Sequence, residues 1–76
     1  MLPKHRHEHD IKWLNETIAR LPVALQIAAC DNYDKVYQAA MDAEPISYKK
    51  SNAARFAANC RLRLYVEAVV KKMSYY

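Results

Sequence analysis

Residues 21–45 read LPVALQIAACDNYDKVYQAAMDAEP, with a proline near each end and no glycine between them. An alanine-rich run without glycine favours an α-helix. Pro22 suits the first position of a helix, because its missing N–H would have no partner there. Pro45 disfavours helical geometry at Glu44. We therefore expect one helix from Pro22 to Ala43.

This helix is amphipathic. At helical spacing its residues divide between two faces. One face carries Leu25, Ala29, Tyr33, Val36, Tyr37 and Ala40, and the other carries Asp31, Asp34, Lys35, Gln38 and Asp42. The pattern is typical of a surface helix with an acidic outer side.

A shorter helix should come before it, capped by His9 or Asp10 and closed by Pro22. Its apolar positions are Ile11, Leu14, Ile18 and Leu21. A chain of 76 residues that is 53% hydrophobic has room for one core. We predict a single all-α domain of three to four helices over residues 1–76, with residues 1–9 as a flexible polar tail.

A long third helix should run from a cap at Ser47 or Ser51 to about Met73, but its apolar residues change sides. Ala53, Phe56, Ala57, Cys60 and Leu64 lie together in the first half, and Leu62, Val66, Val69 and Met73 lie on nearly the opposite side in the second. One straight helix cannot bury both sets against one core. Three solutions stay open: a break near residues 61–63, a core that wraps around the helix end, or contact of the second set with another molecule.

The third solution makes Leu62, Val66, Val69 and Met73 an association surface and the protein a possible homodimer. The residues assigned to the core are Phe56, Trp13, Leu14, Leu25 and Val36.

Charge is unevenly distributed along the chain. Residues 1–47 carry a net charge of −2, whereas residues 48–76 contain seven Lys or Arg and a single acidic residue, Glu67, for a net charge of +6. The basic end favours an anionic partner. The residues predicted to contact it are Lys49, Lys50, Arg55, Asn59, Arg61 and Arg63.

Within this set Arg55, Asn59 and Arg63 are spaced four apart, which predicts an Arg–Asn–Arg ridge along one helix face. Guanidinium groups bind phosphate and asparagine can read adenine, so nucleic acid is the first partner we name. An acidic protein surface is the alternative. It would use the same cations, the second apolar set and the terminal Tyr75 and Tyr76.

Other chemistry finds little support in the sequence. His5, His7 and His9 alternate and could converge on a metal ion if extended, but a flexible terminus lacks the rigid support of metal sites, so we expect no metal. We expect no catalysis, no cofactor and no small-molecule substrate.

Cys30 and Cys60 should be reduced, buried thiols, and a disulfide between them is the minority alternative. With no apolar run of membrane-spanning length, we expect a cytoplasmic protein.

Two segments resemble short helical accessory proteins of temperate phages and mobile elements. They are the pattern Tyr33-x-x-Val36-Tyr37-x-Ala39-Ala40-x-x-Ala43-Glu44-Pro45 and the later Ala53-Ala54-Arg55-x-Ala57-Ala58-Asn59-x-Arg61-Leu62-Arg63. The resemblance implies either a DNA-binding regulator or an inhibitor of a host complex, and it assigns no activity to individual residues. Both partner classes therefore remain open.

Overall fold

The computed structural model describes residues 1–74, which contain three α-helices and no strand. A short 3-10 turn, η1 (Glu8–Asp10), leads into α1 (Ile11–Ala19), which is followed by α2 (Val23–Ala43). A second 3-10 turn, η2 (Ser47–Lys49), leads into α3 (Lys50–Met73). The predicted all-α fold is confirmed, and α3 is one continuous helix. Tyr75 and Tyr76, named above for partner contact, lie outside the described residues.

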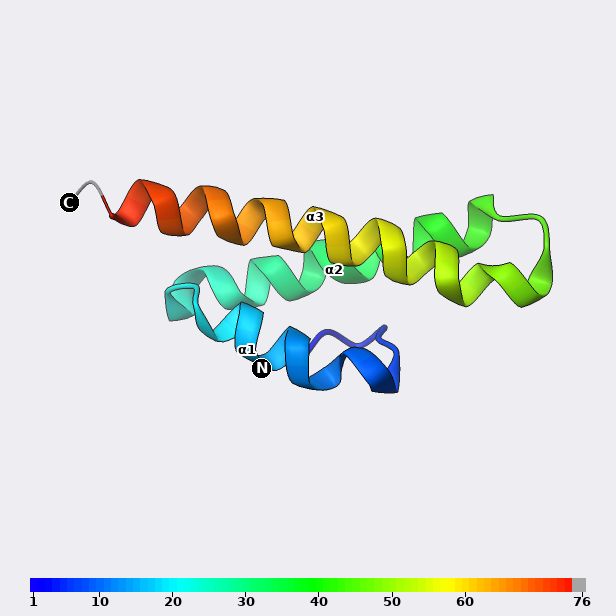
Figure 1. Ribbon diagram of the computed structural model, residues 1–76, viewed down its shortest axis with the longest axis horizontal. Helices are drawn as coiled ribbons and strands as arrows, with labels where there is room; N and C mark the ends of the chain where they lie inside the picture. The colour runs from blue at the N-terminus through cyan, green and yellow to red at the C-terminus, as the bar shows by residue number, and fades with distance from the viewer. Residues whose placement is uncertain (75–76) are drawn as a thin grey trace.

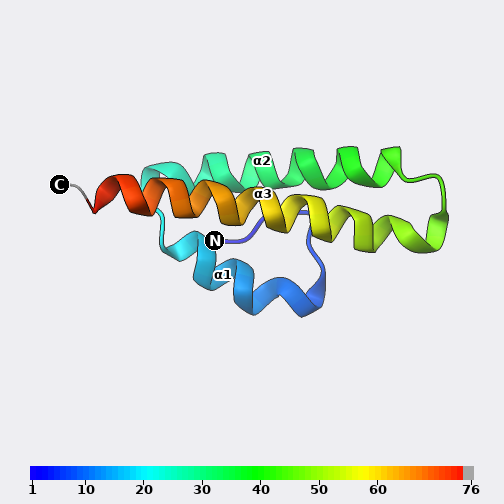
Figure 2. The ribbon, with the colours of Figure 1, turned by 45° about the horizontal axis from the view of Figure 1, so that its top comes forward.

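The long helices α2 and α3 run antiparallel, and α1 lies against one side of this pair (Figure 1). The result is an elongated molecule with extents of 46 × 18 × 17 Å. The C-terminal end of α3 projects beyond α2 in both views (Figures 1 and 2). The opposite side of the α2/α3 pair has no third helix on it within residues 1–74.

The helix boundaries agree with the sequence, but the caps do not. Pro22 is extended at ψ 146° and stands just before α2 instead of opening it. Helix α3 begins after Lys49 with no side-chain cap, so neither Ser47 nor Ser51 caps it. Asp10 occupies the N-cap position of α1 but makes no capping hydrogen bond. Its carboxylate is instead bound to side chains of α3, where the Arg55 guanidinium donates two hydrogen bonds to it.

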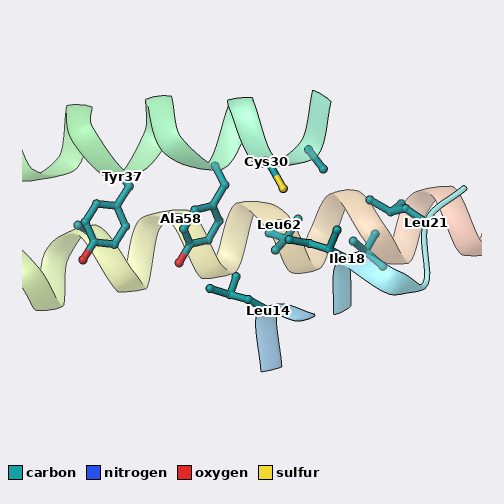
Figure 3. Packing of buried hydrophobic residues seen from close by; sticks show 11 residues of the cluster. Leu14, Ile18, Leu21, Cys30, Tyr37, Ala58 and Leu62 are labelled. Atoms are coloured by element: carbon teal, nitrogen blue, oxygen red, sulfur yellow. The ribbon is translucent and has the colours of Figure 1, made fainter. Parts of the chain in front are cut away.

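The core lies where all three helices meet. Figure 3 shows Leu14 and Ile18 of α1 approaching Leu62 on α3. The buried hydrophobic residues are Leu14, Ile18, Leu21, Ala29, Cys30, Tyr33, Tyr37, Ala54, Ala58, Leu62 and Val66. Trp13, Leu25 and Val36, which were assigned to the core, are half-buried against this cluster. Cys30 and Cys60 are both free thiols, the first buried and the second half-buried.

The two apolar sets of α3 have separate outcomes. Leu62 and Val66 lie in the core, whereas Phe56 is 75% exposed, so the assignment of Phe56 to the core is wrong. The buried positions advance four residues at a time, from Ala54 to Val66. Each step turns the buried face by about 40° around the helix. The small buried residues Ala54 and Ala58 occupy the first half of α3, and the larger Leu62 and Val66 follow in the second half.

The N-terminal segment, which we predicted as a flexible tail, packs on the bundle (Figure 2). Pro3 is fully buried. The backbone N–H groups of Lys4 and His5 donate to the Asp34 carboxylate on α2, at 3.2 and 2.7 Å. The Arg6 side chain donates to the carbonyl of Pro3 at 2.6 Å. These contacts fix the N-terminal segment on the bundle, a few residues before Asp10, which contacts α3.

Candidate partner-binding surface

Two residues of the predicted Arg–Asn–Arg ridge are engaged inside the fold. Arg55 donates from Nε and Nη2 to the two carboxylate oxygens of Asp10, at 2.8 and 2.9 Å. Asn59 donates from Nδ2 to the same carboxylate at 3.1 Å. A guanidinium held at two points by a carboxylate is not free to bind phosphate. The prediction that Arg55 and Asn59 form an outward ridge with Arg63 is therefore corrected.

Tyr33 completes this cluster from α2, donating its hydroxyl hydrogen to Oδ1 of Asn59 at 2.5 Å. The Arg55 hydrogen bond holds the pKa of Asp10 below its ordinary value, with Asn59 adding to the effect. Burial, followed by the nearby Asp10 charge, raises the pKa of the Tyr33 hydroxyl. Asp10 is thus ionised and Tyr33 neutral at neutral pH, as the hydrogen bonds require. The cluster ties the start of α1 to both long helices.

Lys50, like Arg55 and Asn59, is engaged inside the fold. Its ammonium group donates to the backbone carbonyls of Met41, at 2.8 Å, and Glu44. These carbonyls lie at the C-terminal end of α2, where a cation satisfies acceptors that the helix leaves open. Three of the six residues predicted for anion contact, Lys50, Arg55 and Asn59, therefore hold the fold together.

The other three predicted residues, Lys49, Arg61 and Arg63, are exposed. Arg63 forms an exposed ion pair with Glu67 one turn later, at 3.6 Å. Such a pair contributes little to stability and exchanges easily for another partner. Lys71 and Lys72 add exposed positive charge near the end of α3. The positive charge that remains available thus lies on α3 and at its start.

The predicted association surface is divided in the same way. Leu62 and Val66 are buried among the chain's own helices, so their assignment to self or partner contact is wrong. Val69 is half-buried against the core, and only Met73 is exposed. The oligomeric state stays a prediction that this set no longer supports.

A different apolar set faces outward on α3. Phe56 and Leu64 are 75% and 57% exposed, and they stand two turns apart on the side away from the core. The helical repeat places Cys60 between them and Arg63 and Lys71 beside them. The same repeat places the exposed acidic residue Glu67, the partner of Arg63, on this side as well. We call Phe56, Cys60, Arg63, Leu64, Glu67 and Lys71 the outer face of α3. Sequence reasoning found these apolar positions but could not tell which of the two sets would be covered.

The three N-terminal histidines do not converge. His5 stands against Tyr37, with ring centroids 6.0 Å apart, while the rings of His7 and His9 lie 4.7 Å from each other. Across residues 1–74, no three His, Cys, Asp or Glu side chains are grouped so that they could hold a metal ion. In the same part of the chain no helix combines the length and apolar character needed to cross a membrane.

Comparisons with protein-family models, with curated proteins and with solved structures find no match for this chain.

Proposed function

We propose that this chain is a non-enzymatic binding protein that docks an acidic partner protein on the outer face of α3. The observation that carries the proposal is the exposure of Phe56 and Leu64, two large apolar side chains on one helix face. Exposed apolar side chains that lie together mark interaction sites more often than isolated ones do. Such a pair offers two anchors for the apolar side of a partner.

Charge supports an acidic partner. Arg63 and Lys71 share the outer face with a single acidic residue, Glu67, and residues 48–76 carry a net charge of +6. Positive side chains around apolar anchors resemble the rim and core of a protein interface. The rim attracts carboxylates and speeds association, while the anchors slow dissociation. The anchors span eight residues, about 12 Å along the helix, which two to three turns of an amphipathic partner helix would cover.

Nucleic acid is the second candidate, favoured by a separate observation. Tyr48 is 79% exposed, stands next to Lys49 in η2 and precedes Phe56 by eight residues. Exposed aromatic rings among cations suit stacking on the bases of a single strand. The engagement of Arg55 and Asn59 with Asp10 weakens the case for a helix that reads a duplex groove. Either candidate would suit the small phage accessory proteins that the sequence resembles.

Capture from an extract of the source cells tests the proposal, with the parent, a Phe56→Asp variant and an Ile27→Asp variant immobilised. Ile27 is a matched control, because it is 59% exposed on α2 and away from the outer face. We expect one protein to be retained by the parent and by Ile27→Asp and lost with Phe56→Asp. Its binding should persist at high salt, because apolar anchors are not screened. No retained protein, or retention that ignores Phe56→Asp, would overturn the proposal.

A titration of labelled single-stranded and duplex DNA at two salt concentrations separates the two candidates. The parent is compared with Arg63→Ala and Tyr48→Ala. Binding that falls steeply with salt and weakens in both variants would move the assignment to nucleic acid. Absence of DNA binding at low salt would exclude nucleic acid and leave the binding of a protein partner as the proposed function.

A further inference from the structure

A pocket of ≈ 220 Å³ opens between α2 and α3. Its apolar walls include Ala28, Ala58 and Leu62, and Tyr65 stands at its side, while Asn32 and Arg61 supply polar groups. Asn32 and Arg61 are exposed, so the polar groups lie toward solvent. The pocket exists because alanines occupy positions where larger side chains would fill the groove between the helices.

The pocket lies on the side of the α2/α3 pair away from α1. On α2, Asn32 is two residues from Asp34, which binds the N-terminal segment and so faces the other way. On α3, Arg61 is likewise two residues from Asn59, which binds Asp10. Two residues correspond to about 200° around a helix. The pocket therefore opens away from Asp10, although the Tyr33 side chain, whose hydroxyl belongs to the Asp10 cluster, forms part of its lining. Figures 1 and 2 show no other helix on that side.

The volume of the pocket suits a small apolar ligand group. A cavity of about 150 Å³ lined by apolar side chains holds a benzene molecule, whereas sites for drug-sized ligands usually begin at about 300 Å³. The space between α2 and α3 lies between these limits. It suits a single aromatic ring or a branched aliphatic group with a short polar extension.

Arg61 indicates the chemistry of the polar group that the ligand would carry. Arg55 is held by Asp10 and Arg63 pairs with Glu67, but among residues 1–74 the Arg61 guanidinium forms no ion pair. A guanidinium binds a carboxylate through two parallel hydrogen bonds. The amide of Asn32, across the pocket on α2, can donate to the same group.

We propose that this pocket binds an apolar carboxylate of one ring, with the ring between the alanines and the carboxylate on Arg61. The same chemistry is present in a free aromatic acid and in an aromatic side chain beside a carboxylate in a peptide. The site does not depend on the outer face of α3, so either assignment can fail alone.

An NMR titration of the intact, isotope-labelled protein with phenylacetate tests the site. We expect the amide signals of Ala28, Ala58 and Tyr65 to shift and saturate at millimolar ligand, the range of a small fragment. Phenylacetamide and acetate should each bind at least about tenfold more weakly, because one lacks the charge and the other the ring. Equal binding of phenylacetamide, or shifts scattered away from the pocket, would overturn the proposal.

Three variants complete the test. Arg61→Gln should lose at least about tenfold in affinity while Arg63→Gln, on the same exposed helix, stays like the parent. Ala28→Trp should fill the pocket from its rim and abolish the shifts while leaving the helical spectrum intact. If Arg63→Gln weakens binding as much as Arg61→Gln does, the ligand is attracted by general charge and the site is refuted.

A blocked Glu-Phe dipeptide amide, titrated beside phenylacetate, identifies the source of the ligand. Tighter binding of the dipeptide would assign the pocket to a partner's side chain. Tighter binding of phenylacetate would assign it to a free acid.

Discussion

The guanidinium of Arg55 forms two hydrogen bonds with the carboxylate of Asp10, 45 residues away in the sequence, at 2.8 and 2.9 Å. This contact joins the first residue before α1 to the first half of α3. It also removes Arg55 from the surface on which the sequence placed it. Several consequences for stability can be measured.

Replacing Asp10 with alanine should destabilise the fold. The change removes three hydrogen bonds and leaves Arg55 and Asn59 without their shared acceptor, at a cost of about 1–3 kcal/mol in the free energy of unfolding. Urea denaturation followed by circular dichroism measures it. Glu16→Ala is the matched control on α1, because Glu16 is exposed and should change stability by less than about 0.5 kcal/mol. Equal stabilities of the two variants would show that the Asp10 cluster contributes nothing.

The same carboxylate predicts a pH dependence. Its hydrogen bonds lower the pKa of Asp10 in the folded chain from the ordinary value of 3.8. Below that value the unfolded chain therefore binds more protons than the folded one. The stabilisation is fully present above pH 4, roughly, and is lost as pH falls through the folded pKa. The stability gap between the parent and Asp10→Asn should accordingly shrink in acid, and a gap constant from pH 6 to about pH 2 would contradict the lowered pKa.

Removal of the Tyr33 hydroxyl tests the end of the cluster on α2. Tyr33→Phe keeps the buried ring but leaves Oδ1 of Asn59 without its donor, which should cost about 1 kcal/mol. Tyr48→Phe is the matched control, because Tyr48 is exposed and the same change should have no measurable effect. A Tyr33→Phe variant as stable as the parent would mean that Asn59 finds another donor, such as water.

The two apolar sets of α3 differ sharply in what truncation should do. Leu62→Ala leaves a cavity in the core and should cost about 2–5 kcal/mol, whereas Phe56→Ala should change stability by about 0.5 kcal/mol or less. Thermal denaturation of the two variants under identical conditions measures the difference. A larger loss for Phe56→Ala would mean that α3 is rotated and that the exposed surface is elsewhere.

Val66→Asp should unfold the chain at any protein concentration, since Val66 is fully buried.

The fold was largely predictable because local signals agree with it. Pro22 and Pro45 bracket α2, and the alanine-rich run between them has no competing structure. Helix α3 was harder, because both of its apolar sets contain large hydrophobic side chains. Which set is buried depends on the close approach of α2 and on the position of α1, and neither can be inferred from α3 alone.

The candidate site was less predictable for a related reason. Asp10 stands where a helix cap belongs, so a purely local interpretation of that residue is sufficient and hides its long-range partner. The spacing of Arg55 and Asn59 is likewise typical of a helix that reads a DNA groove, but both side chains donate hydrogen bonds to the carboxylate of Asp10. The net charge of the C-terminal third predicts an anionic partner, but the distinction between structural and available cations required the tertiary contacts of Lys50 and Arg55.

The affinity of the captured protein for single alanine variants tests most directly whether the outer face of α3 binds the partner. By isothermal titration calorimetry, Phe56→Ala and Leu64→Ala should each weaken binding by at least about tenfold, a loss of about 1.4 kcal/mol, while Ile27→Ala binds like the parent. All three variants must keep the parent's helical spectrum. Parent-like affinity of both Phe56→Ala and Leu64→Ala would contradict the account.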